Sequence, residues 1–181
     1  MRHSLQPVML VLISLVVSAC TGLPDGIEPV DEFDINRYLG KWYEIARLDH
    51  SFERNLSNVS AEYSLRDDGG VKVINRGYLK SKGKWKEAEG KAYFVGKPDE
   101  AYLKVSFFGP FYGSYVVFEL DKDKYQYAFV TSHNTSYLWL LSRSPTVSKE
   151  IVDRFIKKSR TLGFETDSLI FVDNEQAGTR H

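Results

Sequence analysis

The stretch Gly40-Lys41-Trp42-Tyr43-Glu44-Ile45-Ala46-Arg47 decides how this chain is organised. Its short run of aromatic, branched and small residues is typical of a β-strand. Gly40, two residues before Trp42, suits a position where the chain bends and another backbone comes close. We therefore expect this stretch to be the first strand of a sheet.

Seven further stretches of strand-like composition follow the first, without helical periodicity between them. Asp67-Asp68-Gly69-Gly70 suits a tight hairpin turn between two of them. Short strands at this spacing predict an all-β protein, an eight-stranded antiparallel up-and-down barrel, rather than βαβ units. The expected strands are residues 41–49, 58–66, 71–79, 85–95, 102–108, 115–121, 126–132 and 137–143.

The last expected strand ends at Leu141-Ser142-Arg143. In a closed antiparallel barrel with an even number of strands, the last strand runs against the first, so Arg143 meets Trp42. A guanidinium over an indole contributes roughly 0.5–2 kcal/mol. We expect Gly40, Trp42 and Arg143 to form the floor of the barrel, closed by a helical turn over residues 34–38.

The alternation of side chains tells which face of each strand is buried. Val71 and Val73 share one face of their strand, and Lys72 points to the other. Charged side chains in the middle of strands would be costly against lipid, so the barrel itself is not expected to cross a membrane.

An eight-stranded barrel either fills with side chains or holds one small ligand. The inward positions mix small residues with aromatic ones, which favours an apolar cup, although a packed interior remains the alternative. The expected ligand-binding residues are Ala46, Tyr63, Asn75, Phe94, Phe107, Tyr115, Val117 and Trp139.

Four loops are expected at the open end of the barrel. The loop from Phe108 to Gly113 is rich in aromatic residues, which suggests a ligand gate or an interface, including a homodimer. The first loop could be a lid that offers charge to a lipid head group. The expected mouth and interface residues are Phe52, Arg54, Phe108, Phe111 and Tyr112.

The N-terminal residues have the order of a secretory signal. A short basic start at Arg2-His3 precedes an apolar run over residues 8–17 and then the small pair Ser18-Ala19. This apolar run is too short to span a bilayer as a helix of about 20 residues. We expect residues 1–19 to be a signal peptide, and Cys20, the sole cysteine, stands at its cleavage point.

One amphipathic helix is expected after the barrel, from Ser148 to Gly163, packed on the outside. A short strand over residues 169–172 would return to the sheet edge. The chain has 24 basic and 24 acidic residues, which does not favour a nucleic-acid partner. The scattered histidines and single cysteine give no metal site, and no cofactor is expected.

Four stretches, at residues 37–47, 63–70, 105–113 and 137–143, together resemble the lipocalins of the calycin superfamily. The bacterial outer-membrane lipocalin lipoproteins are the most similar group, and the resemblance covers residues 30–173. It implies cleavage before Cys20, acylation of Cys20, and a membrane anchor on the periplasmic side of the outer membrane. The implied domains are a lipidated tether (20–32), a lipocalin domain (33–173) and a flexible tail (174–181).

The same resemblance implies a carrier that stores or transports fatty acids and lysophospholipids for membrane maintenance under stress. Two other classes of function remain open. A structural or interaction lipoprotein would act through the aromatic loop at residues 108–113. An enzyme acting on a bound lipid could use Glu44 as a buried acid, but no Ser-His-Asp spacing is evident, so no catalytic residue is assigned.

Overall fold

A computed structural model describes residues 21–174 of the chain. The expected signal peptide, the expected acylation site Cys20 and residues 175–181 of the expected tail lie outside these described residues. Within residues 21–174, no helix has the length and apolar character needed to cross a membrane.

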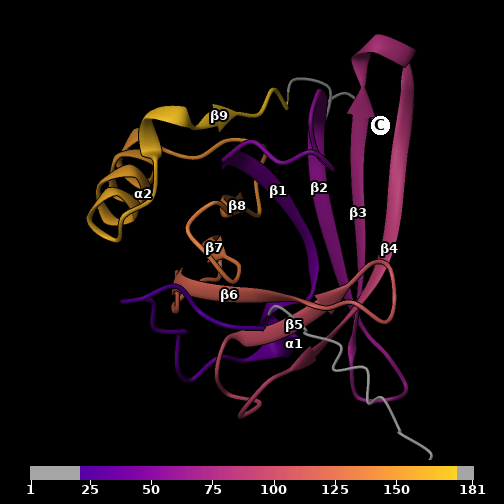
Figure 1. The fold of residues 1–181 in the computed structure, drawn as a ribbon, viewed down its shortest axis with the longest axis vertical. Coiled ribbons are helices and arrows are strands. Elements are labelled where there is room, and N and C mark those ends of the chain that lie inside the picture. The colour runs from indigo at the N-terminus through magenta and orange to yellow at the C-terminus, as the bar shows by residue number, and fades with distance from the viewer. Residues whose placement is uncertain (1–20, 175–181) are drawn as a thin grey trace, which may run out of the picture.

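Eight antiparallel strands form a closed barrel, as the sequence predicts, and each lies within two residues of its expected bounds. The strands β3 and β4 form a long hairpin that rises above the rest of the barrel (Figure 1). The barrel strands are β1 (Gly40–Arg47), β2 (Leu56–Leu65), β3 (Val71–Leu79), β4 (Lys84–Phe94), β5 (Tyr102–Ser106), β6 (Gly113–Leu120), β7 (Tyr127–Thr131) and β8 (Leu138–Ser142).

The barrel closes through β1, which pairs with β8 on one side. On its other side β1 pairs with β2 over Gly40 to Tyr43 only. Beyond that point a short ninth strand, β9 (Ile170–Phe171), pairs with Ala46 and Arg47. The backbone N–H of Asn58 then donates to the carbonyl of Asp173 at 2.8 Å. The C-terminal strand therefore fills the seam that β1 and β2 leave open.

The floor of the barrel is built from Trp42 and Arg143, as expected. The Arg143 guanidinium carbon lies 4.1 Å from the centre of the Trp42 ring, which is fully buried. The Arg143 guanidinium also donates to the carbonyls of Arg37 at 2.7 Å and Lys41 at 3.0 Å. Gly40 has φ of +89°, and a Cβ at this position would lie 3.5 Å from the guanidinium. The first strand must therefore begin with a residue free to adopt this conformation.

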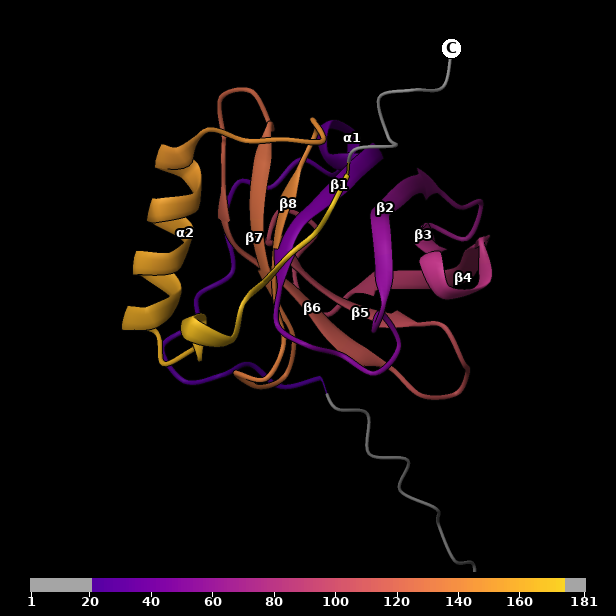
Figure 2. The ribbon, with the colours of Figure 1, turned by 90° about the horizontal axis from the view of Figure 1, so that it is seen from above.

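A single helical turn, α1 (Ile35–Tyr38), covers the floor from below. The Trp42 indole N–H donates to the carbonyl of Tyr38 at 2.8 Å, and the two rings stack with centroids 4.6 Å apart. In Figure 2, α1 lies at one end of the barrel, and the loops that join β1–β2, β5–β6 and β7–β8 lie at the other. The barrel thus has a closed end and an open end.

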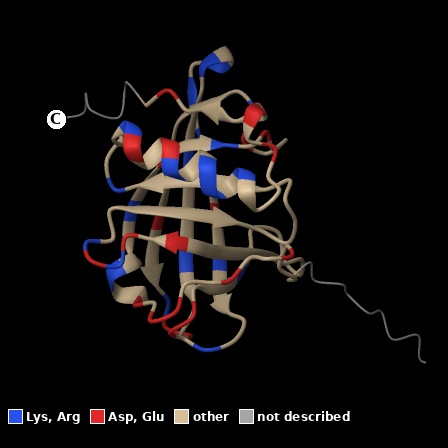
Figure 3. Ribbon diagram, turned by 90° about the vertical axis from the view of Figure 1, so that its left-hand side faces the viewer, with Lys and Arg blue, Asp and Glu red and all other residues tan. Residues whose placement is uncertain are grey.

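The long helix α2 (Lys149–Thr161) packs on the outside of the barrel, as predicted. Its fully buried Phe155 contacts Phe129 of β7, with ring centroids 5.0 Å apart. Acidic and basic residues both occur along this helix (Figure 3), and the exposed ones are Lys149, Glu150, Asp153, Arg154, Lys157 and Arg160. Gly163, with φ of +84°, follows the helix end.

The segment over residues 21–32, expected as a tether, lies against the barrel wall. Ile27 is buried in the core under α2. The N–H of Val30 donates to the carbonyl of Val117 at 2.9 Å, and the carbonyl of Val30 accepts from Ala101 at 2.8 Å. At the other terminus Asn174, expected in the flexible tail, is buried and donates to the carbonyl of Glu44 at 2.8 Å. Both ends of the described chain are therefore fixed to the barrel.

Replacing Arg143 by lysine should keep the charge and remove the planar group that contacts Trp42 and the carbonyls. We expect the free energy of unfolding, measured by urea denaturation, to fall by about 1–3 kcal/mol. The matched control is Arg54→Lys, whose exposed side chain predicts a change within about 0.5 kcal/mol. Equal stability of the two variants would show that the floor does not depend on the guanidinium.

Candidate ligand-binding cup

A cavity of about 600 Å³ occupies the inside of the barrel. A cavity of this volume falls in the range of small-molecule sites, and its wall is mainly apolar. The packed interior, left open by the sequence, is therefore not what the structure shows. The apolar wall includes Val59, Val71, Val73, Ala92, Leu103, Val105 and Val130.

Five of the eight residues expected to bind ligand line this cavity: Tyr63, Asn75, Phe107, Tyr115 and Trp139. Phe94 instead packs near the floor against Phe33, with ring centroids 6.3 Å apart. Val117 is fully buried in the same core cluster and does not line the cavity. These two expectations were wrong in position, although both side chains support the wall.

Ala46 was also expected to face the ligand, and the structure corrects this. The register between β1 and β8 shifts between Glu44 and Ala46, so Ile45 forms a bulge. Ile45 and Ala46 both pack in the outer core beneath α2. A bulge inverts the alternation of side chains after it, which turns Arg47 toward the interior in place of Ala46.

This inversion builds a buried polar wall beside the apolar cup. Arg47 is 2% exposed, and its guanidinium donates to the Glu44 carboxyl at 2.6 Å and to the backbone carbonyl of Glu53 at 3.0 Å. The Trp139 indole N–H donates to the Glu53 carboxyl at 3.1 Å. Both glutamates line the cavity. One guanidinium thus faces two buried carboxyls.

Burial raises the pKa of Glu44 well above its usual value, and the nearby charge of Glu53 raises it further. The positive charge of Arg47 opposes this shift without cancelling it. The pKa of Glu53 is also raised, again chiefly by burial. Each carboxyl acts on the pKa of the other, so we infer that the pair keeps a shared proton to a higher pH than a free glutamate would. The polar wall then presents no net charge to the cavity.

Three tyrosine hydroxyls form a second polar group inside the cup. The Tyr115 hydroxyl lies 2.7 Å from that of Tyr38 and 2.8 Å from that of Tyr63. Burial is the largest cause that raises the pKa of Tyr63 above its usual value, so these hydroxyls stay neutral. Two hydrogen bonds among three hydroxyls leave one O–H proton for another acceptor.

The mouth of the cup is aromatic. Phe52, Phe108 and Phe111 line the cavity opening, as expected for mouth residues. Arg54 and Tyr112 do not line it. The Arg54 guanidinium is held by the Asp49 carboxylate at the surface, and the Tyr112 ring lies over Tyr93 and Lys104. The proposed role of Arg54 in holding a head group is therefore not supported by its position.

Sequence reasoning missed the inward positions of Arg47 and Glu53 and the buried state of His50. His50 stacks between Phe52 and Tyr137, with centroids 5.3 and 4.9 Å away. Burial, with the charge of Arg47, lowers the pKa of His50 to about 4. Loop residues carry no alternation that could show which of them fold inward. The sequence signal that could have found Arg47 is its separation of three residues from Glu44. Two strand residues at that separation share a face only if a bulge lies between them.

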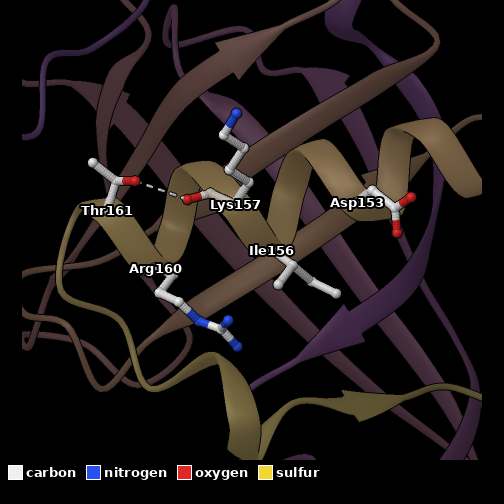
Figure 4. Close-up of a pocket in the computed structure, with 5 residues that line it drawn as sticks. All are labelled: Asp153, Ile156, Lys157, Arg160 and Thr161. Atoms are coloured by element: carbon white, nitrogen blue, oxygen red, sulfur yellow. Dashed lines mark hydrogen bonds between the residues drawn. The ribbon is translucent and has the colours of Figure 1, made fainter.

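A second depression, of about 320 Å³, lies on the outer surface of α2 (Figure 4). The hydroxyl of Thr161 donates to the carbonyl of Lys157 there, at 3.0 Å. Its five lining residues all come from this one helix, so no second element shapes it. The barrel cavity is therefore the candidate site.

Comparison with known proteins agrees with this geometry. The family model for the lipocalin-like domain matches residues 33–174. The chain belongs to the lipocalin family. It is 60% identical to the outer membrane lipoprotein Blc of Vibrio cholerae, over 94% of this chain and all of that protein. It is 51% identical to the outer membrane lipoprotein Blc of Escherichia coli K12, over 88% of this chain and 90% of that protein.

These relatives confirm the outer-membrane, lipid-anchored localisation that the N-terminal sequence of this lipocalin predicts. Among solved structures, insecticyanin from the tobacco hornworm Manduca sexta superposes with a TM-score of 0.67. It is 23% identical and covers 88% of this chain and 90% of its own, so it supports the fold alone.

The shared proton predicts how stability changes with pH. Glu44 keeps a proton in the folded chain and loses it on unfolding, so the folded state binds more protons and raising the pH favours unfolding. The depressed pKa of His50 has the opposite effect, but only between about 4 and its unfolded value of 6.5. Above about pH 6.5 the free energy of unfolding should fall as the pH rises toward the raised pKa of Glu44, by up to about 1.4 kcal/mol per pH unit.

The variant Glu44→Gln removes the titrating group and can still accept from Arg47. Its stability, measured by urea denaturation across the same pH range, should change less with pH than that of the wild type. An unchanged slope would mean that Glu44 is already ionised in the folded protein.

Proposed function

We propose that this lipocalin binds and carries single-chain lipids, fatty acids or lysophospholipids, at the outer membrane. The observation that carries the proposal is the apolar cup of about 600 Å³, closed by Trp42 and Arg143 and opening through an aromatic mouth. We place it in membrane maintenance under stress, a role that the family resemblance alone supports. We assign the anchor to acyl chains on Cys20.

The gain from burying an acyl chain is large enough for useful affinity. About twelve to sixteen methylenes at about 0.8 kcal/mol each would give about 10–13 kcal/mol before costs. Association costs at least about 4 kcal/mol, and micromolar binding requires about 8 kcal/mol net. A single acyl chain in this cup therefore suffices for affinity near the micromolar range.

The polar groups of the cup bear on which lipids it accepts. Glu44 and Glu53 share a proton and sit with a single guanidinium, so the cavity offers no free cation there to pair with a carboxylate. The remaining hydroxyl proton of the tyrosine group can be accepted by an ester, hydroxyl, phosphate or carboxyl oxygen. Both lysophospholipids and fatty acids carry such oxygens, so we propose both classes as ligands.

Ligand binding can be tested with the native fluorescence of Trp139, which lines the cavity. Addition of a lysophospholipid or a fatty acid should quench this fluorescence, with a dissociation constant in the micromolar range or below. Trp139→Phe should lose the ligand-dependent change. No response from any lipid of either class would sink the carrier proposal, and chemical conversion of the bound lipid would favour an enzyme.

A substitution that fills the cup gives the matched test. Ala92→Phe places a ring in the cavity and should weaken lipid binding at least tenfold, as measured by calorimetry. Lys91→Phe adds a ring on the adjacent residue, which does not line the cavity, and should bind as the wild type does. Equal affinities of the two variants would place the ligand elsewhere.

Replacing Cys20 by serine tests the anchor. Several acyl chains, at about 0.8 kcal/mol for each buried methylene, hold a protein to a leaflet almost permanently. The variant should move from the membrane fraction to the soluble fraction after cell breakage. If the variant still sediments with membranes at the wild-type level, Cys20 is not the anchor.

A further inference from the structure

We propose that the barrel docks mouth-first on the leaflet that holds its anchor, with Phe52, Phe108 and Phe111 inserted among the lipids. The partner is a lipid surface, and the docking face consists of these three side chains and the neighbouring Thr21, the first residue that the structure describes. This inference rests on the acylation of Cys20 proposed above. It adds an orientation and an interaction surface that neither the cup nor the anchor implies alone.

The first described residues lie at the open end of the barrel. The Ser114 hydroxyl, beside the mouth loop, donates to the carbonyl of Gly22 at 2.6 Å, and the Tyr102 hydroxyl donates to that of Thr21. The segment then runs toward the floor, where the N–H of Phe33 donates to the carbonyl of Asp99 at 2.8 Å. Figure 2 shows the start of the described chain at the same end as the β5–β6 and β7–β8 loops.

This attachment keeps the distance between the anchor at Cys20 and the mouth of the barrel short. Cys20 is one residue from Thr21, and consecutive Cα atoms are about 3.8 Å apart. A free linker of the twelve residues 21–32 could span up to about 40 Å and would allow any orientation. Because this segment instead lies along the barrel wall, an acyl chain on Cys20 enters the membrane beside the mouth.

The most exposed large apolar side chains of the described residues gather at this same end. Phe108 is 79% exposed, Phe111 is 66% and Phe52 is 58%. The mouth loop, from Phe108 to Gly113, contains no charged residue. Inserting it into lipid would therefore bury apolar rings without burying a charge.

Among the described residues, the closed end has no exposed aromatic cluster, although Leu65 and Val95 are exposed there. The loop that joins β6 to β7 there carries Lys122, Asp123 and Lys124, all exposed. Arg37 donates to the backbone carbonyls of Lys122 and Asp123 and holds this charged loop against the floor. An end of this kind is suited to water. The open end carries the three exposed rings together with the exposed Lys80, Lys82 and Lys84 of the β3–β4 turn, so the docking face is the aromatic side of that end, beside the anchor.

The orientation can be measured on the full acylated protein, reconstituted at low density in vesicles of phosphatidylethanolamine and phosphatidylglycerol. One variant carries a cysteine in place of Thr135, in the β7–β8 loop at the open end. A second variant carries a cysteine in place of Lys124, at the closed end. Each of these cysteines is labelled with an environment-sensitive fluorophore. Both positions are exposed, and neither substitution removes a proposed docking residue. Intact mass, measured first, shows whether Cys20 is acylated.

We expect the Thr135→Cys label to show a blue-shifted emission that is quenched by lipid-borne nitroxides, and the Lys124→Cys label to report water. Adding Phe108→Ser and Phe111→Ser should move the mouth label toward the aqueous spectrum while the acyl chains keep the protein on the vesicle. An unchanged circular dichroism spectrum and an unchanged urea midpoint in that variant would show that the barrel remains folded.

Other results would overturn the inference. Aqueous spectra for both labels on an acylated protein would rule out mouth-first docking and leave the carrier proposal standing. Unmodified Cys20 would remove both the anchor and the docking. The label at position 135 could instead be buried by a second copy of the protein. A dimer that the two serine substitutions dissociate would then assign the aromatic loop to self-association.

Discussion

The contact between the Arg143 guanidinium and the Trp42 indole is what the cup depends on. It joins the first and last strands of the barrel at the point where an open floor would let water into the cavity. The guanidinium also ties together Arg37, Lys41 and Tyr125 through their carbonyls. These bonds hold the turn α1 under the barrel, so one side chain positions the plug and both closing strands.

Above this floor, two polar groups interrupt the apolar wall without charging it. The tyrosine hydroxyls bond to one another and keep one O–H for a further acceptor, and the raised pKa values lead us to infer that Glu44 and Glu53 share a proton beside Arg47. Buried carboxyls are costly unless neutralised or paired, and this arrangement does both. The cup can therefore remain suited to an acyl chain and still offer hydrogen bonds to the polar atoms of a lipid.

The sequence predicts most of the fold because its signals are local or follow from closure. Strand composition and turn residues place all eight strands, and antiparallel closure places Arg143 against Trp42. Errors in the candidate site have two physical origins. A bulge at Ile45 inverts the alternation of β1, so Ala46 turns away from the cup and Arg47 turns inward to bond Glu44. The first loop folds Glu53 and His50 inward, where no periodicity applies. The proline-containing segment before the barrel finds hydrogen-bond partners on β6 that its composition does not reveal.

A crystal structure of this lipocalin with a bound lysophospholipid would test the central claim most directly. The account predicts electron density for one acyl chain inside the barrel, against Val71, Val73 and Val105, with the floor contact intact and the polar end nearer the mouth. Density for the lipid only on the outer surface, or a cavity closed by rearranged side chains, would contradict it.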